Sequence, residues 1–192
     1  TPPYSSAASD VYKRQLHSST ITAAKNRQVD VPTNDADNNK GNYATINPLA
    51  VLSSDVTLSL GNLKAVYAGD HAAEFTIARL TSGKWYWELK NTTNAAGSTG
   101  VIQGSYYGSL DRSANLNSTG IYYYNPFSGQ KVKDGSMSSY GSATTTNDIL
   151  QVALDLDNNK IWWGINNTWQ NSGDPAGGTN AAYTDLTDTD YT

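Results

Sequence analysis

The side chains that most often perform chemistry in proteins are scarce in this chain. Its 192 residues include no cysteine, two histidines and only two glutamates, Glu74 and Glu88. The lack of cysteine excludes thiol catalysis, a disulfide framework and cysteine-ligated zinc. Few side chains are therefore available for acid–base or metal chemistry.

Glu88 is a candidate catalytic carboxylate, but no partner carboxylate lies near it in the sequence. A retaining glycosidase needs two carboxyl groups about 5–5.5 Å apart. On one face of a strand these would stand two or four residues apart, and the residues there are Lys90 and Thr92. We therefore expect no catalytic residue and no enzymatic activity.

Residues 155–159, Asp-Leu-Asp-Asn-Asn, begin like a calcium-binding loop. Such a loop has Gly at its sixth position and Glu at its twelfth, where this chain has Lys160 and Asn166. A hairpin turn explains the run better, because Asn and Asp tolerate positive φ. His71 stands without a second ligand beside Asp70. We expect no metal ion and no cofactor.

Tyrosine-rich loops are the best candidates for a binding site. Residues 103–127 carry tyrosines among Gly, Ser and Asn, which is typical of binding loops, since Tyr supplies rigid contact area with one polar tip. Residues 170–182 are expected to form a long loop without core residues. The alternative is that the tyrosines pack beneath the loops as core. The expected ligand-binding residues are Tyr106, Tyr107, Arg112, Tyr122, Tyr124, Tyr140 and Trp169.

The elements that must position these side chains are predicted to be β-strands. Apolar and polar residues alternate in short runs bounded by Gly, Asn and Asp, which is the signal of half-buried strands. No segment has helical periodicity over the length of a helix. The sequence predicts an all-β, two-sheet antiparallel β-sandwich. The clearest alternating runs are 56–60, 63–67, 74–80, 85–89, 150–156 and 161–165.

Residues 149–169 are predicted to form a three-stranded meander with turns at 157–160 and 166–167. Alternation also places Trp85, Trp87 and Leu89 together on one strand face, which we expect to pack in the core. The inward face of the meander is expected to carry Leu150, Val152, Leu154, Leu156, Ile161, Trp163 and Ile165.

Three segments resemble a known family. Residues 82–89, SGKWYWEL, are similar to a G-K-x-Y-W-E-V strand, and Gly100-Val101 is similar to the G-V strand that follows it. Residues 147–155, NDILQVALD, followed by KIWW at 160–163, resemble G-D-x-I-G-V-x-L-D followed by L-x-F-x-x-N-G. Together they resemble the SPRY domains, which are β-sandwiches of the concanavalin-like jelly-roll type.

The resemblance implies a recognition module without catalysis, in which loops at one end of the sandwich bind a protein or peptide. The sequence departs from the family pattern at Asn147 and Asn167, where glycines are usual, and at Leu150-Gln151, where Ile-Gly is usual. These departures concern loop geometry more than the fold. A carbohydrate-binding lectin-like domain or a glycan-active enzyme of the same superfold is the alternative.

The N-terminal residues are expected not to belong to the domain. Residues 5–15, SSAASDVYKRQ, resemble the in-frame translation of a transposase-type sequencing adapter, so 1–15 are interpreted as an artefact. Residues 16–42 are a polar segment or linker, and 43–192 form the SPRY-like domain. Its sequence ends where a closing strand is expected, which predicts a truncated domain.

Charge and hydropathy limit the partners. The formal net charge is -4 and no basic patch is present, which argues against nucleic acid. No stretch approaches the roughly 20 apolar residues of a membrane span. Residues 42–49 are similar to the entry of SPRY-like segments in phage and environmental viral proteins. A virion or extracellular setting is therefore expected.

Overall fold

The computed structural model describes residues 45–49, 56–67, 79–93, 97–107 and 120–192. All of them belong to the second of two compact units, Thr1–Tyr43 and Ala44–Thr192. The adapter-like residues, the polar segment 16–42 and most of the expected strand 74–80 lie outside the described residues. Within the described part, no helix is long and apolar enough to cross a membrane.

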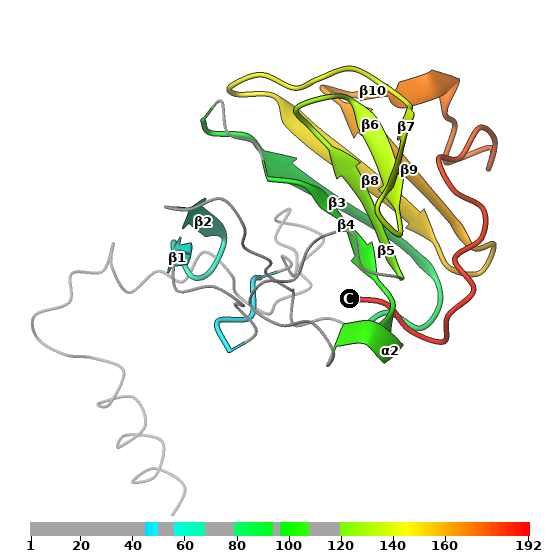
Figure 1. Ribbon diagram of the computed structural model, residues 1–192, viewed down its shortest axis with the longest axis horizontal. Coiled ribbons are helices and arrows are strands. Elements are labelled where there is room, and N and C mark those ends of the chain that lie inside the picture. Colours follow the sequence, from blue (N-terminus) through cyan, green and yellow to red (C-terminus); the bar gives the residue numbers. More distant parts are fainter. Residues whose placement is uncertain (1–44, 50–55, 68–78, 94–96, 108–119) are drawn as a thin grey trace, which may run out of the picture. The chain divides into compact units, whose positions relative to one another are not determined.

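One sheet contains the meander predicted over 149–169. Its strands run antiparallel in the order β10-β9-β8-β3 (Figure 1). Asn166 and Asn167 join β9 to β10 with φ of 49° and 65°. A two-residue hairpin turn of this type needs positive φ at both positions, which Asn tolerates. The bounds are β3 (Lys84–Lys90), β8 (Ile149–Asp155), β9 (Lys160–Ile165) and β10 (Thr168–Trp169).

The second sheet is also antiparallel, in the order β4-β5-β6-β7 (Figure 1). Asp134 and Gly135, with φ of 50° and 76°, make the tight turn between β6 and β7. A short helix, α2 (Gly104–Tyr107), follows β4. The bounds of the strands are β4 (Thr99–Ile102), β5 (Ile121–Asn125), β6 (Gln130–Lys133) and β7 (Ser136–Ser139).

A separate hairpin is formed by β1 (Val56–Ser59) and β2 (Lys64–Tyr67), paired antiparallel with Val56 opposite Tyr67. Leu60, Gly61 and Asn62 in its turn all have positive φ. Both strands were predicted from the alternation of apolar and polar residues.

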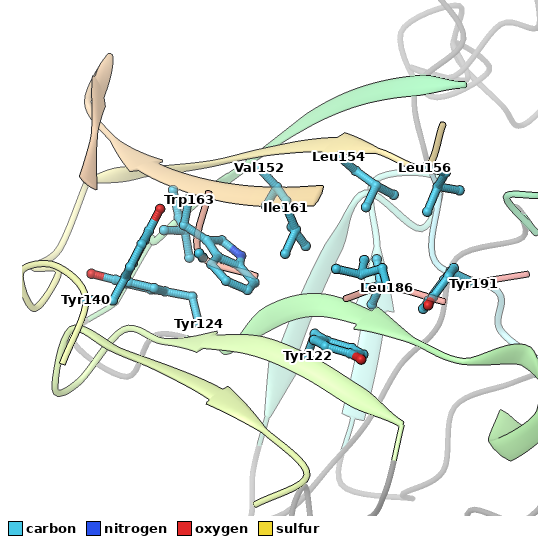
Figure 2. Packing of buried hydrophobic residues seen from close by; sticks show 13 residues of the cluster. Tyr122, Tyr124, Tyr140, Val152, Leu154, Leu156, Ile161, Trp163, Leu186 and Tyr191 are labelled. Carbon is cyan, nitrogen blue, oxygen red and sulfur yellow. The ribbon is translucent and has the colours of Figure 1, made fainter. Parts of the chain in front are cut away.

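The core lies between the two four-stranded sheets. Figure 2 shows Tyr122 and Tyr124 of β5 pointing toward the residues of β8 and β9 that face them. The indole N–H of Trp163 donates to the carbonyl of Thr99 at 3.2 Å, so β9 is also joined to β4. The predicted all-β, two-sheet antiparallel sandwich is confirmed. Its buried cluster includes Val101, Tyr140, Leu150, Val152, Leu154, Leu156, Ile161 and Trp163, with Ile165 packed against it.

The inward face of the meander is as predicted, whereas the prediction for β3 is partly wrong. Trp87 packs against the core, and its indole N–H donates to Thr99 Oγ1 at 3.3 Å. Trp85 and Leu89 share its side of the strand, yet they are 45% and 39% exposed. Alternation fixes which face a side chain occupies, but the extent of the opposite layer decides whether it is covered.

The segment after β10 contributes to the core, which corrects the expectation of a loop without core residues. Ala182 is 4% exposed, and Leu186 and Tyr191 are each 1% exposed within the buried cluster. Figure 2 shows Leu186 and Tyr191 among the core side chains. Gln170, at the start of η2 (Gln170–Ser172), is buried as well. The segment fills space that two four-stranded sheets leave open.

The last residues also pair through their backbone. Tyr191 forms antiparallel bridges with both Leu80 and Gln103. Thr192 and Ile102 exchange two hydrogen bonds, at 2.9 and 3.0 Å. The segment therefore hydrogen-bonds to the end of β4. The absence of a further closing strand stays a prediction.

Candidate functional site

Three of the expected binding residues lie in the core. Tyr122, Tyr124 and Tyr140 are 2%, 0% and 7% exposed, so they offer no contact area to a ligand. The hydroxyl of Tyr124 donates to the carbonyl of Ser142 at 2.5 Å, and that of Tyr122 to the carbonyl of Asp185 at 3.1 Å. Burial raises the pKa of both Tyr124 and Tyr140 to about 12. For these residues the alternative role, packing beneath the loops, is the one observed.

Two other expected binding residues lie in helix α2. Tyr106 and Tyr107 end helix α2, and their side chains lie outside the described residues. Arg112 also lies outside them. A binding role for these three residues stays a prediction from the sequence.

Trp169 is the expected binding residue that remains at the surface. It is partly buried and lies opposite Gly164 in the pairing of β10 with β9. A Cβ added to Gly164 would stand 3.0 Å from Trp169 Cε3. Glycine at position 164 therefore allows the indole to lie close against the sheet. The indole occupies the side of the sheet that faces away from the core, which we call the outer face.

Tyr86 lies on the same outer face and packs against Trp169. The two ring centroids are 6.3 Å apart with an interplanar angle of 76°, which is the edge-to-face arrangement that aromatic rings favour. Tyr86 is 53% exposed. Its neighbour in sequence, Trp85, points to the opposite face of β3 because successive side chains alternate.

Between the two rings lies a hydrogen-bonded polar network. Gln151 Nε2 donates to the hydroxyl of Tyr86 at 2.6 Å and to Asn167 Oδ1 at 3.2 Å. Gln151 Oε1 accepts from the backbone N–H of Asn167 at 2.6 Å. The hydroxyl of Tyr86 in turn donates to Glu88 Oε1. We call Tyr86, Glu88, Gln151, Asn167 and Trp169 the outer-face cluster.

Gln151 fixes the geometry of the outer-face cluster. It is only 5% exposed, and its side-chain amide uses both its oxygen and its nitrogen within the cluster. Partial burial, and then the hydrogen bond to Glu88, raises the pKa of Tyr86. The phenol therefore stays protonated at neutral pH and keeps donating to Glu88.

Among the described strands, Glu88 of the outer-face cluster has no carboxylate partner at the spacing that glycosidases use. The next carboxylate on this face of the described strands is Asp155. In the strand pairing it lies opposite Lys84, which is four residues along β3 from Glu88. At about 3.3 Å per residue that separation is roughly 13 Å, beyond the 5–9.5 Å that glycosidases use. The carboxylate of Asp155 also accepts a hydrogen bond at Oδ2 from Asn158 Nδ2, at 2.9 Å. Among the described residues, no group of three or more His, Cys, Asp or Glu could hold a metal ion.

The sequence predicted Trp169 of this cluster, but not Tyr86, Gln151 or Asn167. A usable signal was present, because alternation separates Tyr86 and Glu88 from the apolar residues of β3. The register then brings Glu88 opposite Gln151 and Gln151 opposite Gly164. That register depends on strand pairing, which no single segment of sequence specifies.

The outer face has a second, covered region. Trp162, next to Trp163 in β9, points outward and is nevertheless 1% exposed. Its indole N–H donates to the carbonyl of Thr179 at 2.8 Å, and a Cβ on Gly173 would stand 3.0 Å from its Cδ1. The segment that follows β10 therefore covers this part of the sheet and leaves the outer-face cluster at the open part.

Comparison with known proteins supports the fold. No protein-family model matches the chain, and no curated protein matches it. The crystal structure of the SPRY domain of human HERC1 is similar, with a TM-score of 0.58 and 17% sequence identity. The match covers 76% of this chain and 85% of that one. The fold is therefore SPRY-like, as the sequence motifs predicted.

Proposed function

We propose that this domain is a non-enzymatic recognition module whose ligand binds on the outer-face cluster. One observation carries the proposal: the exposed ring of Tyr86 is fixed by the buried amide of Gln151. A ligand that meets a fixed ring loses little affinity to ordering of the protein. Aromatic side chains with few rotatable bonds are common at the centres of binding sites.

The SPRY-like fold is consistent with this proposal, and so is the lack of a carboxylate pair around Glu88. A protein or peptide partner, and a phage or viral structural setting, stay predictions from the sequence resemblance. A binding role for Tyr106, Tyr107 and Arg112 also stays a prediction from the sequence.

A screen with two kinds of probe tests the proposal. The full chain is tested against a displayed peptide library and a glycan array, and each binder is tested again with the double variant Tyr86→Ala/Trp169→Ala. We expect the double variant to lose the binders. Trp85→Ala is the matched control, because Trp85 is similarly exposed but lies on the other face of β3.

Binders that the double variant retains would place the site elsewhere, and substitution of Tyr106, Tyr107 and Arg112 would then be tested. A chain that binds neither kind of probe would contradict a recognition function. Release of new reducing ends from a glycan, abolished by Glu88→Gln, would contradict the non-enzymatic role.

A further inference from the structure

We infer that the ligand of the outer-face cluster is a neutral carbohydrate chain. This inference rests on the proposed function and names the ligand class for the same site. It follows from three properties of the cluster: its aromatic surface, its unused hydrogen-bonding groups and its charge.

The aromatic surface suits a sugar ring. Pyranose rings have faces lined by C–H groups, and these pack favourably on the electron-rich faces of Trp and Tyr. Tyr86 and Trp169 are in edge-to-face contact, so their ring planes are nearly perpendicular. Two nearly perpendicular rings form a corner, whereas two parallel, stacked rings would form a flat surface.

The polar groups between the rings match hydroxyls. The carboxylate of Glu88 accepts one hydrogen bond, from Tyr86 at Oε1, and Oε2 has no donor among the described residues. The side-chain nitrogen of Asn167 likewise donates to no described residue, whereas its oxygen accepts from Gln151. A sugar hydroxyl donates and accepts at once, so it can satisfy both groups.

The charge of the cluster favours a neutral sugar. Glu88 is its one charged member and stays an acceptor in the bound state, while the exposed Lys90 lies two residues further along the same face of β3. A hydroxyl donating to a carboxylate makes a short charge-assisted hydrogen bond. A carboxylated or sulfated sugar would instead bring a like charge close to Glu88.

The carboxylate of Glu88 also argues against a large protein partner. Standard protein interfaces bury about 800 Å² on each side, with few charged residues at the centre. Here Glu88 lies within the cluster, and residues 173–179 cover the neighbouring Trp162. A protein partner that buried Glu88 would have to supply a cation against it, whereas a small ligand can leave this carboxylate partly in solvent.

The inference is tested by titrating the full chain with short neutral gluco-, manno- and galacto-configured oligosaccharides, followed by calorimetry and ligand-observed NMR. We expect at least one series to bind. Tyr86→Ala and Trp169→Ala should each weaken binding about tenfold or more, which corresponds to a loss of about 1.4 kcal/mol. Trp85→Ala should change affinity by less than about twofold.

Two conservative variants separate recognition from folding. Tyr86→Phe keeps the ring and removes the hydroxyl that joins Glu88 to Gln151, and Glu88→Gln keeps the shape and removes the charge. Both variants should unfold at nearly the wild-type temperature. Their affinity for the oligosaccharide should nevertheless be lower than that of the wild type. Unchanged affinity in both variants would overturn the hydrogen-bonding role of the cluster.

The outcomes distinguish this inference from the function on which it rests. Peptides that bind through Tyr86 and Trp169, with no binding of neutral oligosaccharides, would overturn the carbohydrate inference and retain the recognition module. Binding of acidic oligosaccharides alone would overturn the choice of a neutral ligand. Oligosaccharide binding that survives Tyr86→Ala/Trp169→Ala would place the site elsewhere and overturn the inference that the outer-face cluster binds carbohydrate.

Discussion

The hydroxyl of Tyr86 accepts a hydrogen bond at 2.6 Å from Gln151, so a ring that is 53% exposed is held by a side chain that is 5% exposed. Surface tyrosines usually rotate freely about their side-chain bonds. Here the ring orientation is fixed from beneath by the amide that also holds the β9–β10 turn at Asn167. Turn and aromatic surface are therefore coupled through Gln151.

Replacing Gln151 should disturb both. Gln151→Ala removes three hydrogen bonds, and we expect unfolding to become easier by roughly 1–3 kcal/mol. Urea denaturation measures the change, and Thr168→Ala, at an exposed neighbouring position, is the control. A variant as stable as the wild type would show that solvent replaces the amide without cost.

The two tryptophans of β9 should be equally important for stability, although they face opposite sides of the sheet. Trp162→Ala and Trp163→Ala should each cost about 3–5 kcal/mol, since both side chains are buried. Trp85→Ala, at a half-exposed position, should cost much less. Near-wild-type stability of Trp162→Ala would mean that residues 173–179 do not cover the outer face in solution.

Gly100 is expected to tolerate no side chain. A Cβ there would lie 1.9 Å from the carbonyl oxygen of Tyr122 and 2.6 Å from Tyr123 Cα, and these backbone atoms cannot move without breaking the pairing of β4 with β5. Gly100→Ala should therefore destabilise the domain by several kcal/mol, roughly as other severe core substitutions do. Gly97→Ala is the matched control, because its nearest contact would be an ordinary 3.6 Å to a side chain. Thermal unfolding of the two variants compares them, and similar midpoints would contradict the close approach at Gly100.

Alkaline pH should unfold the domain through its buried tyrosines. Burial raises the pKa of Tyr124, Tyr140 and Tyr183 from 10.0 to about 12. The unfolded chain loses these protons near pH 10 and the folded chain only near pH 12, so the free energy of unfolding should fall as pH rises between these values. Phenolate absorbance and denaturant titrations measure this. Tyrosines that all ionise near pH 10 with unchanged stability would contradict the burial of these hydroxyls.

Several strands could be predicted from the sequence because alternation is a local property, whereas β6 and β7 were not predicted. Residues 150–156 and 161–165 display it strongly, and their inward face is confirmed. Burial could not be predicted as well, because it depends on segments distant in the chain. Trp162 faces outward and is covered by residues 173–179, whereas Trp85 faces inward and remains half exposed.

The candidate site was predicted only in part for a related reason. Tyrosine suits both a core and a surface, so composition could not separate Tyr124 in the core from Tyr86 on the outer face. The network through Gln151 needs the exact pairing of β3, β8 and β9 and one choice of side-chain orientation. Neither is encoded in a single run of residues.

The contribution of residues 182–191 to the core has a consequence for synthesis on the ribosome. Chains emerge from the N-terminal side, so every named strand leaves the exit tunnel before Leu186 and Tyr191 do. Until those side chains arrive, the apolar faces of both sheets lack part of their cover and remain available to chaperones or to neighbouring nascent chains. This part of the core should therefore form late, after translation has passed Tyr191.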